Sequence, residues 1–162
     1  MKSSLLVFTL LLGGAAWADG NTNLAPAVSN TKWKTECSDC HMAYPPALLP
    51  ERSWRKMMAG LGSHFGQDAS LDAATAKEIT SFLAGNSAER AGGKRAKKVL
   101  GSLGPNEAPQ RISETAWFVR EHDEVAPQVW KRAKIGSPAN CNACHQGAGQ
   151  GNYSENQIRI PR

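Results

Sequence analysis

Cysteine and histidine are both scarce in this chain, with four residues of each among 162. All four cysteines fall in two copies of the pentapeptide Cys-x-x-Cys-His, at residues 37–41 and 141–145. No cysteine remains outside these copies, and only two histidines do. Chemistry that needs thiol or imidazole side chains is therefore confined to the two pentapeptides and to what surrounds them.

Long apolar runs are also lacking. The longest, residues 5–12, is too short to cross a bilayer, which takes about 20 residues. It follows Lys2 and precedes Ala16-Trp17-Ala18, the layout of a secretory signal with a small-x-small cleavage site. We expect residues 1–18 to be removed and the mature chain to be periplasmic. An uncleaved membrane anchor is the alternative.

The two pentapeptides have the pattern of covalent c-type haem attachment. The two thiols of each copy, Cys37 with Cys40 and Cys141 with Cys144, add to the vinyl groups of one haem, and the next residue, His41 or His145, binds its iron. A zinc site or two redox disulfides would also use Cys-x-x-Cys pairs, but neither explains a histidine after both copies. The sequence predicts two c-type haems.

The two remaining histidines, His64 and His122, supply a second axial ligand for each iron. His64 lies 23 residues after His41, and His122 lies 23 residues before His145. The simplest assignment pairs His41 with His64 and His145 with His122. Alternative ligands are Met57 and Met58, but both lie in an expected amphipathic helix where packing against haem is the simpler role.

Bis-histidine ligation has consequences for function. Two imidazoles give a lower reduction potential than the His/Met pair of mobile cytochromes c, and they leave no open position for substrate. We therefore expect an electron carrier and not an enzyme. The alternative is a small haem redox enzyme, or a ligand-binding haem protein, in which one distal histidine dissociates.

The chain is expected to be mainly α, a c-type cytochrome of short helices and loops around two haems. We expect a first haem unit over residues 19–85, a connector over 86–110 and a second haem unit over 111–162. The clearest helix is expected over residues 72–83. Further expectations are an irregular lead over 21–34, a helix capped by Ser113 that carries Trp117, Phe118 and His122, and a tail of surface coil after Gly147.

The connector is basic, with Arg90, Lys94, Arg95, Lys97 and Lys98 among glycines. A flexible or partly helical link is one interpretation, and a docking patch for an acidic partner is the other. Nucleic acid is not an expected partner for an exported protein.

Four motifs stand out, as Glu36-Cys37-x-x-Cys40-His41-x-Ala43-Tyr44-Pro45-Pro46-x-Leu48-Leu49-Pro50-x-Arg52-Ser53-Trp54, as His64-Phe65-Gly66, as Arg111-Ile112-x-Glu114-Thr115-x-Trp117-Phe118 with His122, and as the second Cys-x-x-Cys-His. These motifs carry a resemblance to the periplasmic dihaem cytochrome c family. It covers nearly all of the mature chain. The resemblance implies a small, helical, bis-histidine electron-transfer protein ligated through His41, His64, His122 and His145. It also implies an oxygen-binding monohaem cytochrome c as partner and a membrane cytochrome b as electron source.

Overall fold

The computed structural model describes residues 28–162. Their regular secondary structure is helical, with two isolated bridges, His64 with Gln67 and His145 with Ile158, and no strand among these residues. The mainly α fold class is confirmed. The expected signal, residues 1–18, lies outside the described part of the chain. None of the helices within residues 28–162 has the length and hydropathy needed to cross a membrane.

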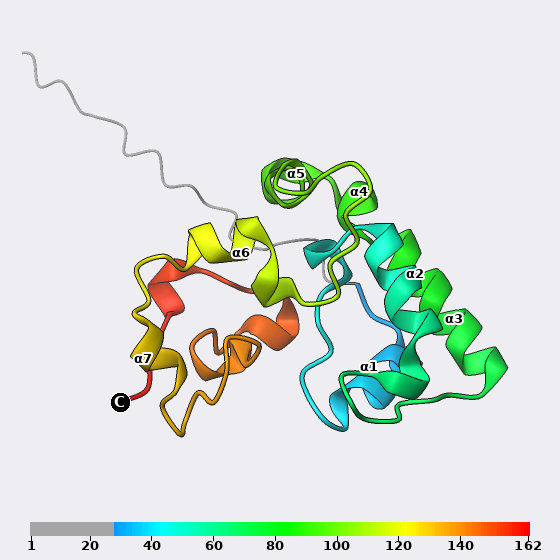
Figure 1. Ribbon diagram of the computed structural model, residues 1–162, viewed down its shortest axis with the longest axis horizontal. Coiled ribbons are helices and arrows are strands. Elements are labelled where there is room, and N and C mark those ends of the chain that lie inside the picture. Colours follow the sequence, from blue (N-terminus) through cyan, green and yellow to red (C-terminus); the bar gives the residue numbers. More distant parts are fainter. Residues whose placement is uncertain (1–27) are drawn as a thin grey trace, which may run out of the picture.

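Residues 28–162 form seven α-helices and six short 3-10 helices. The α-helices are α1 (Thr31–Ser38), α2 (Glu51–Ala59), α3 (Ala73–Gly85), α4 (Ala88–Ala91), α5 (Gly93–Gly101), α6 (Ala116–Glu121) and α7 (Pro127–Trp130). The 3-10 helices are η1 (Pro46–Leu48), η2 (Leu61–Ser63), η3 (Ile112–Glu114), η4 (Cys141–Ala143), η5 (Ala148–Gln150) and η6 (Glu155–Gln157). Figure 1 shows α1 to α3 at one end of the molecule, α6 and α7 at the other, and α4 and α5 above the junction between them.

Side-chain caps set the start of α1 and α3. Asn30 Oδ1 accepts a hydrogen bond from the amide of Trp33 (2.8 Å), so the expected irregular lead is wrong from Thr31 onward. Asp72 caps α3 by accepting from the amides two and three residues later, both at 3.0 Å. The helix expected over 72–83 is therefore present, starting one residue later and extending two residues further.

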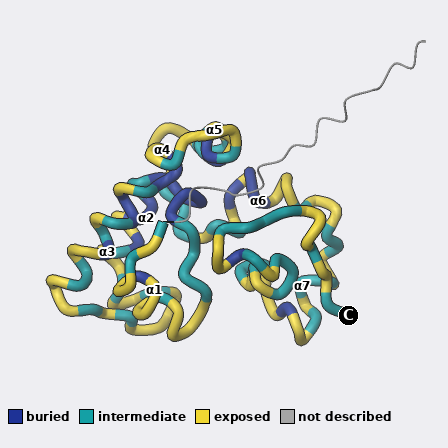
Figure 2. Tube along the Cα trace, turned by 180° about the vertical axis from the view of Figure 1, so that it is seen from behind, coloured by how far each residue is buried: buried dark blue, intermediate teal, exposed yellow. Residues whose placement is uncertain are grey.

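Two apolar clusters make up the core, and consecutive leucines belong to different ones. Leu49 is buried in the first cluster, formed by α1 to α3, whose other buried members are Trp33, Trp54, Ile79 and Leu83. Leu48 is buried in the second, with Ala88, Val99, Trp117 and Phe118 from α4, α5 and α6. Figure 2 shows the buried trace concentrated in these two places. The loop before α2 thus joins the two ends of the molecule through adjacent side chains.

The expected connector is partly helical. Residues 88–101 form α4 and α5, and Ala88 and Val99 are each 1 % exposed in the second cluster. The amide of Ala88 also donates to the carbonyl of Leu49 (3.0 Å). This segment is part of the core that links the two ends of the chain.

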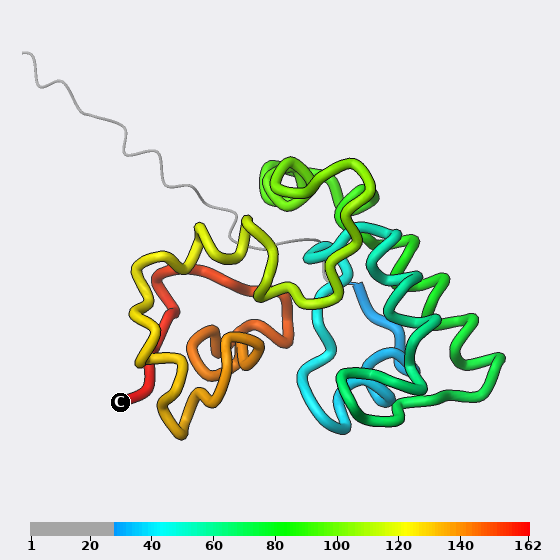
Figure 3. Tube along the Cα trace, viewed as in Figure 1, coloured from blue at the N-terminus to red at the C-terminus, as the bar shows by residue number. Residues whose placement is uncertain are grey.

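The tail after Gly147 is not surface coil, which corrects the expectation from the sequence. It forms η5 and η6, and Ala148 is fully buried. The amide of Arg159 donates to the carbonyl of Cys144 (3.0 Å), and Arg132 Nη1 donates to the carbonyl of Pro161 (2.7 Å). Figure 3 shows the tail passing beneath α6 and ending beside α7. It closes over the second pentapeptide.

Candidate functional site

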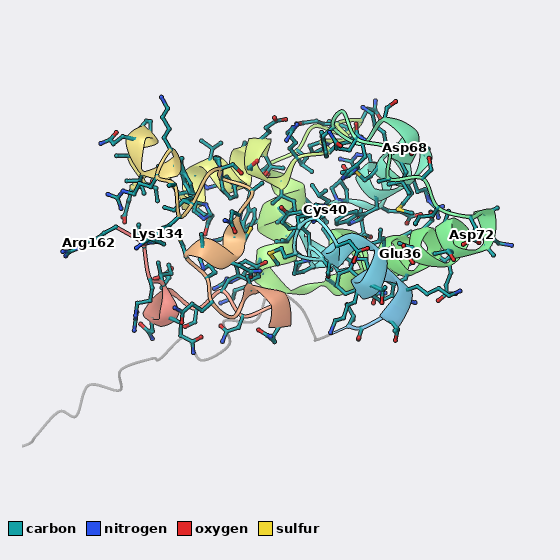
Figure 4. All side chains as sticks on the ribbon, turned by 90° about the horizontal axis from the view of Figure 1, so that it is seen from below. Glu36, Cys40, Asp68, Asp72, Lys134 and Arg162 are labelled. Atoms are coloured by element: carbon teal, nitrogen blue, oxygen red, sulfur yellow. The ribbon has the colours of Figure 1, made fainter. Side chains whose placement is uncertain are left out.

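The two pentapeptides begin in different local structures. Cys37 is in the last turn of α1, whereas Cys141 starts the 3-10 helix η4. None of the four cysteines is paired in a disulfide. Within residues 28–162 no three histidine, cysteine or acidic side chains converge on one metal position, so the Cys-x-x-Cys pairs do not assemble the four-thiolate zinc site considered above. Figure 4 places Cys40 near the middle of the molecule, between Asp72 at one end and Lys134 and Arg162 at the other.

The cysteine environments favour neutral thiols. Burial, with a smaller contribution from Glu36, raises the pKa of Cys37 to about 11, and burial raises that of Cys141 to about 11. A redox or metal-binding thiol instead needs an environment that lowers its pKa. The environments of Cys37 and Cys141 therefore fit covalent attachment to haem better than a redox or metal-binding role, which needs the thiolate.

The structure brings the four histidines together in two facing pairs. The ring centroids of His41 and His64 are 6.1 Å apart, and those of His122 and His145 are 6.0 Å apart. Two imidazoles on opposite sides of one metal ion should stand about 6 Å apart, because each metal–nitrogen bond is about 2 Å and each ring centre lies roughly 1 Å behind its nitrogen. Both pairs therefore have the spacing that one axially ligated iron requires. Met57 is buried in α2, and Met58 packs against the first apolar cluster.

In the first pair, a backbone carbonyl and an aromatic ring fix the orientation of His41. Its Nδ1 lies 2.7 Å from the carbonyl of Met42, which can only accept, so Nδ1 carries the proton and Nε2 is free to bind a metal. Tyr44 stacks on the same ring at 4.9 Å. These contacts fix both the tautomer and the plane of His41.

The other member of the first pair, His64, lies in the loop after η2. The next residue, Phe65, has a φ of 51°, unusual for a residue with a side chain, and packs edge-on against His64 at 4.8 Å. The guanidinium of Arg111 lies 3.9 Å from the Phe65 ring centroid. Burial, then His41 and then Arg111 lower the pKa of His64, which favours the neutral imidazole that a metal needs.

In the second pair, His122 is held by α6, which it follows directly. Its Nδ1 lies 2.9 Å from the carbonyl of Phe118, and the two rings stack at 4.0 Å. The cap of α6 is Thr115, not Ser113 as expected, because Ser113 is inside η3; the hydroxyl of Thr115 accepts from the Phe118 amide (3.1 Å). The helix, its cap and the ring stack together orient His122.

His145 is supported differently. Tyr153 from the tail lies against it, with ring centroids 5.2 Å apart. Burial, then His122 and then Arg95 lower the pKa of His145, so this imidazole too is kept neutral. The tail contact was missed from the sequence because residues 148–158 carry no periodic pattern, although Tyr153 is one of only two tyrosines in the chain.

Unpaired buried donors cluster at the second pair. Within the described part of the chain, five buried side-chain atoms have no hydrogen-bond partner; three of them, Trp117 Nε1, His145 Nδ1 and Tyr153 Oη, belong to this site, and the other two are the hydroxyls of Ser53 and Ser87. A buried donor without an acceptor costs about 1–3 kcal/mol. Tyr153 packs against the cluster that contains Trp117, and it also touches His145. A haem brings two carboxylates as acceptors, so these residues fit that group.

Tyr44 connects the two sites. Besides stacking on His41, its hydroxyl donates to the carbonyl of Ala139 (2.8 Å), two residues before Cys141. Burial, and then Cys141, raise the pKa of Tyr44 to about 12, so the hydroxyl keeps its proton. The Tyr44 side chain therefore links His41 of the first site to the loop that precedes the second pentapeptide.

Comparisons with known proteins give one consistent result. The family model described as dihaem cytochrome c matches residues 33–153. A solved diheme cytochrome c from Rhodobacter sphaeroides is 48 % identical over 78 % of this chain and 98 % of its own, with a TM-score of 0.70. A diheme cytochrome type c from Shewanella baltica OS155 is 35 % identical over 82 % of this chain and 93 % of its own, with a TM-score of 0.67. No curated protein matches.

Proposed function

This chain belongs to the dihaem cytochrome c family, and from that premise we propose that it is a periplasmic electron carrier whose two haems are both ligated by two histidines. The chain carries two c-type haems. We assign Cys37 and Cys40 with His41 and His64 to the first haem. To the second we assign the remaining two cysteines and two histidines, Cys141, Cys144, His122 and His145.

The observation that carries the proposal is the spacing of the two histidine pairs, 6.1 and 6.0 Å between ring centroids. A bound haem supplies one-electron iron redox chemistry. His41 with His64 and His122 with His145 would hold the two irons, and four such imidazoles would leave no position for substrate. Two imidazoles also stabilise the ferric state relative to a His/Met pair, so both reduction potentials should be low.

Passage of electrons between the two haems is supported by the position of Tyr44. Its ring lies on His41 and its hydroxyl reaches the loop of the second pentapeptide. Together the two contacts fix the two sites relative to each other. The chain thus holds its two redox centres in one rigid arrangement, as an internal transfer step requires.

The partners belong to the same proposal. An oxygen-binding monohaem cytochrome c would receive the electrons and a membrane cytochrome b would supply them, as the family resemblance implies. Residues 1–18 would direct export and would be removed by cleavage after Ala18. All of these proteins would then meet in the periplasm.

Ligation can be tested one histidine at a time. His64→Ala and His122→Ala should each convert one of the two haems to a high-spin form, about half of the haem absorption, while both haems stay attached. Met57→Leu and Met58→Leu serve as controls and should leave both haems low-spin. A histidine variant that stays wholly low-spin would show that the residue is not a ligand.

Carbon monoxide separates an electron carrier from a ligand-binding protein or enzyme. The ferrous wild type should bind it slowly or not at all, whereas each histidine variant should bind one equivalent rapidly. A rapid and complete Soret shift of the wild type at either haem would instead indicate that a distal histidine dissociates.

A further inference from the structure

The positive charge of the chain is concentrated in α4 and α5. Residues 88–101 contain five lysines and arginines and one glutamate, so they carry four of the five net positive charges of the whole chain. The remaining residues are close to neutral. Figure 1 shows this segment raised above the junction of the two ends of the molecule. The excess of positive charge therefore lies in one projecting segment, whereas basic and acidic residues nearly balance in the rest of the chain.

The two faces of α5 differ sharply. Lys94, Lys97 and Lys98 recur at the three- and four-residue spacing of one helix face and are exposed. Ala96 and Val99 are buried, at 2 % and 1 % exposure. Within residues 28–162, Lys94 and Lys97 form no ion pair, and Lys98 has only a long contact of 3.7 Å with Glu121 on α6. The three lysines, called here the α5 patch, are open to a partner.

The α5 patch is backed by the second haem site. Val99 packs in the cluster that contains Trp117 and Phe118. Phe118 in turn stacks on His122 at 4.0 Å. Only one layer of apolar side chains therefore separates the helix from residues that support the second iron.

We propose that the α5 patch is the docking surface for the acidic face of a redox protein, and that electrons enter or leave the molecule there through the second haem. The proposal rests on the electron-transfer function proposed above. The patch is charged and has no apolar anchor: the exposed large apolar residues of the described chain, Phe65, Val119 and Ile160, all lie outside α4 and α5. An interfacial membrane helix would need such anchors, so an acidic protein is the better fit.

The test compares two charge reversals of equal size. Lys94→Glu with Lys97→Glu, called here the patch variant, reverses the charge of two of the three patch lysines. Lys56→Glu with Lys77→Glu makes the same change in net charge on α2 and α3, where both lysines are exposed. Glutamate near the start of α5 is favourable for the helix, so folding should survive. Unchanged low-spin spectra of both haems in every variant would verify this.

Two probes give up one electron each to the ferric haems in stopped-flow experiments. Flavodoxin hydroquinone, an acidic protein, is oxidised to its neutral semiquinone, and the methyl viologen radical cation, a strong one-electron reductant, is oxidised to the dication. The patch variant should be reduced by flavodoxin about tenfold or more slowly than wild type at low ionic strength, with the effect disappearing in high salt, and its reduction by the viologen radical should not be slowed. The α2 and α3 variant should stay within about twofold of wild type. Rapid-freeze electron paramagnetic resonance should place the slowed step at the second haem.

Two outcomes would overturn the proposal. One is an equal effect of both double reversals, which would indicate only net charge. The other is loss of binding to phosphatidylglycerol vesicles in the patch variant with unchanged flavodoxin kinetics, which would assign the patch to a membrane. Failure of the underlying function is distinguishable, because the ferrous wild type would then bind carbon monoxide rapidly at one haem, whatever the flavodoxin kinetics.

Discussion

Around His41 and His64 the chain forms helices of eight, nine and thirteen residues, whereas around His122 and His145 the longest helix has six. The first region also has its own apolar cluster, with Ile79 and Leu83 almost completely buried. The second region shares its cluster with Leu48 and with α4 and α5. Short helices are not stable by themselves, so the second region depends more on its neighbours and on its haem.

The two regions also orient their ligands in opposite ways. In the first, the histidine of the pentapeptide donates to a backbone carbonyl, that of Met42; in the second, the distal His122 does so, to Phe118. The ring planes of the first pair are inclined by 32°, and those of the second are nearly perpendicular, at 84°. Equal spacing in the sequence therefore leads to two sites with different ligand geometry.

Removing each haem in turn should give the largest difference in stability between the two regions. Cys141→Ser with Cys144→Ser should abolish amide-exchange protection across residues 111–162, because the short helices there lose the body on which they pack. Cys37→Ser with Cys40→Ser should leave protection in α2 and α3, which retain Trp54, Ile79 and Leu83 as a core. Hydrogen-exchange mass spectrometry measures both. Equal loss of protection in the two variants would contradict the prediction that the second region depends more on its haem than the first.

Substitution of a helix cap should destabilise the second region more than the first, and this is the next largest effect that we expect. The Thr115 hydroxyl is buried, accepts from the Phe118 amide and donates to the carbonyl of Ile112 (2.8 Å). Thr115→Ala should lower the free energy of unfolding by about 1–2 kcal/mol. Thr115→Ser keeps the hydroxyl and should therefore retain most of the free energy of unfolding that Thr115→Ala loses. Asp72→Ala, at the exposed cap of α3, should cost less; urea denaturation compares all three, and a larger loss at Asp72 would contradict the prediction.

Sequence patterns predicted the parts of the fold that depend on neighbouring residues. Asp72 and the apolar periodicity after it indicate α3, and equal 23-residue spacings indicate which histidines face each other. Ser113 was preferred over Thr115 as a cap although both are capping residues, because only tertiary packing selects between them. Asn30 caps α1 within the segment expected to be irregular, because one capping residue does not by itself indicate that a helix follows.

Contacts between distant residues account for what the sequence did not predict. The tail is held by the hydrogen bond from Arg159 to Cys144 and by the contact of Tyr153 with His145. Neither leaves a repeating pattern in residues 148–158. Likewise, Arg111 meets Phe65 across 46 positions of the chain. Such contacts follow from how the two regions are placed, and short motifs do not encode that placement.

Removal of a single oxygen atom, the hydroxyl of Tyr44, should weaken the link between the two regions. Tyr44→Phe removes the hydroxyl that donates to Ala139 but keeps the ring that stacks on His41. We expect a loss of about 1 kcal/mol in the free energy of unfolding, the net contribution of a typical hydrogen bond, with both haems still low-spin. Urea denaturation followed at the Soret band gives the value. No change in stability would mean that the two regions are held together without this contact.

The smallest expected effect is an acid sensitivity of the first region. Glu78 on α3 accepts from Lys32 (2.7 Å) and from Asn30 (3.1 Å), and these hydrogen bonds, the one from Lys32 first, lower the pKa of Glu78 below its ordinary value of 4.5. A lowered carboxyl pKa contributes stability that is present above the unfolded value and is lost as the pH falls through the folded one. The melting temperature of wild type should therefore exceed that of Glu78→Gln slightly at pH 7, and the two should converge below about pH 4. Because both partners are about half exposed, 0.5 M salt should reduce the difference. A difference that persists in acid would show that the carboxylate charge is not what ties α1 to α3.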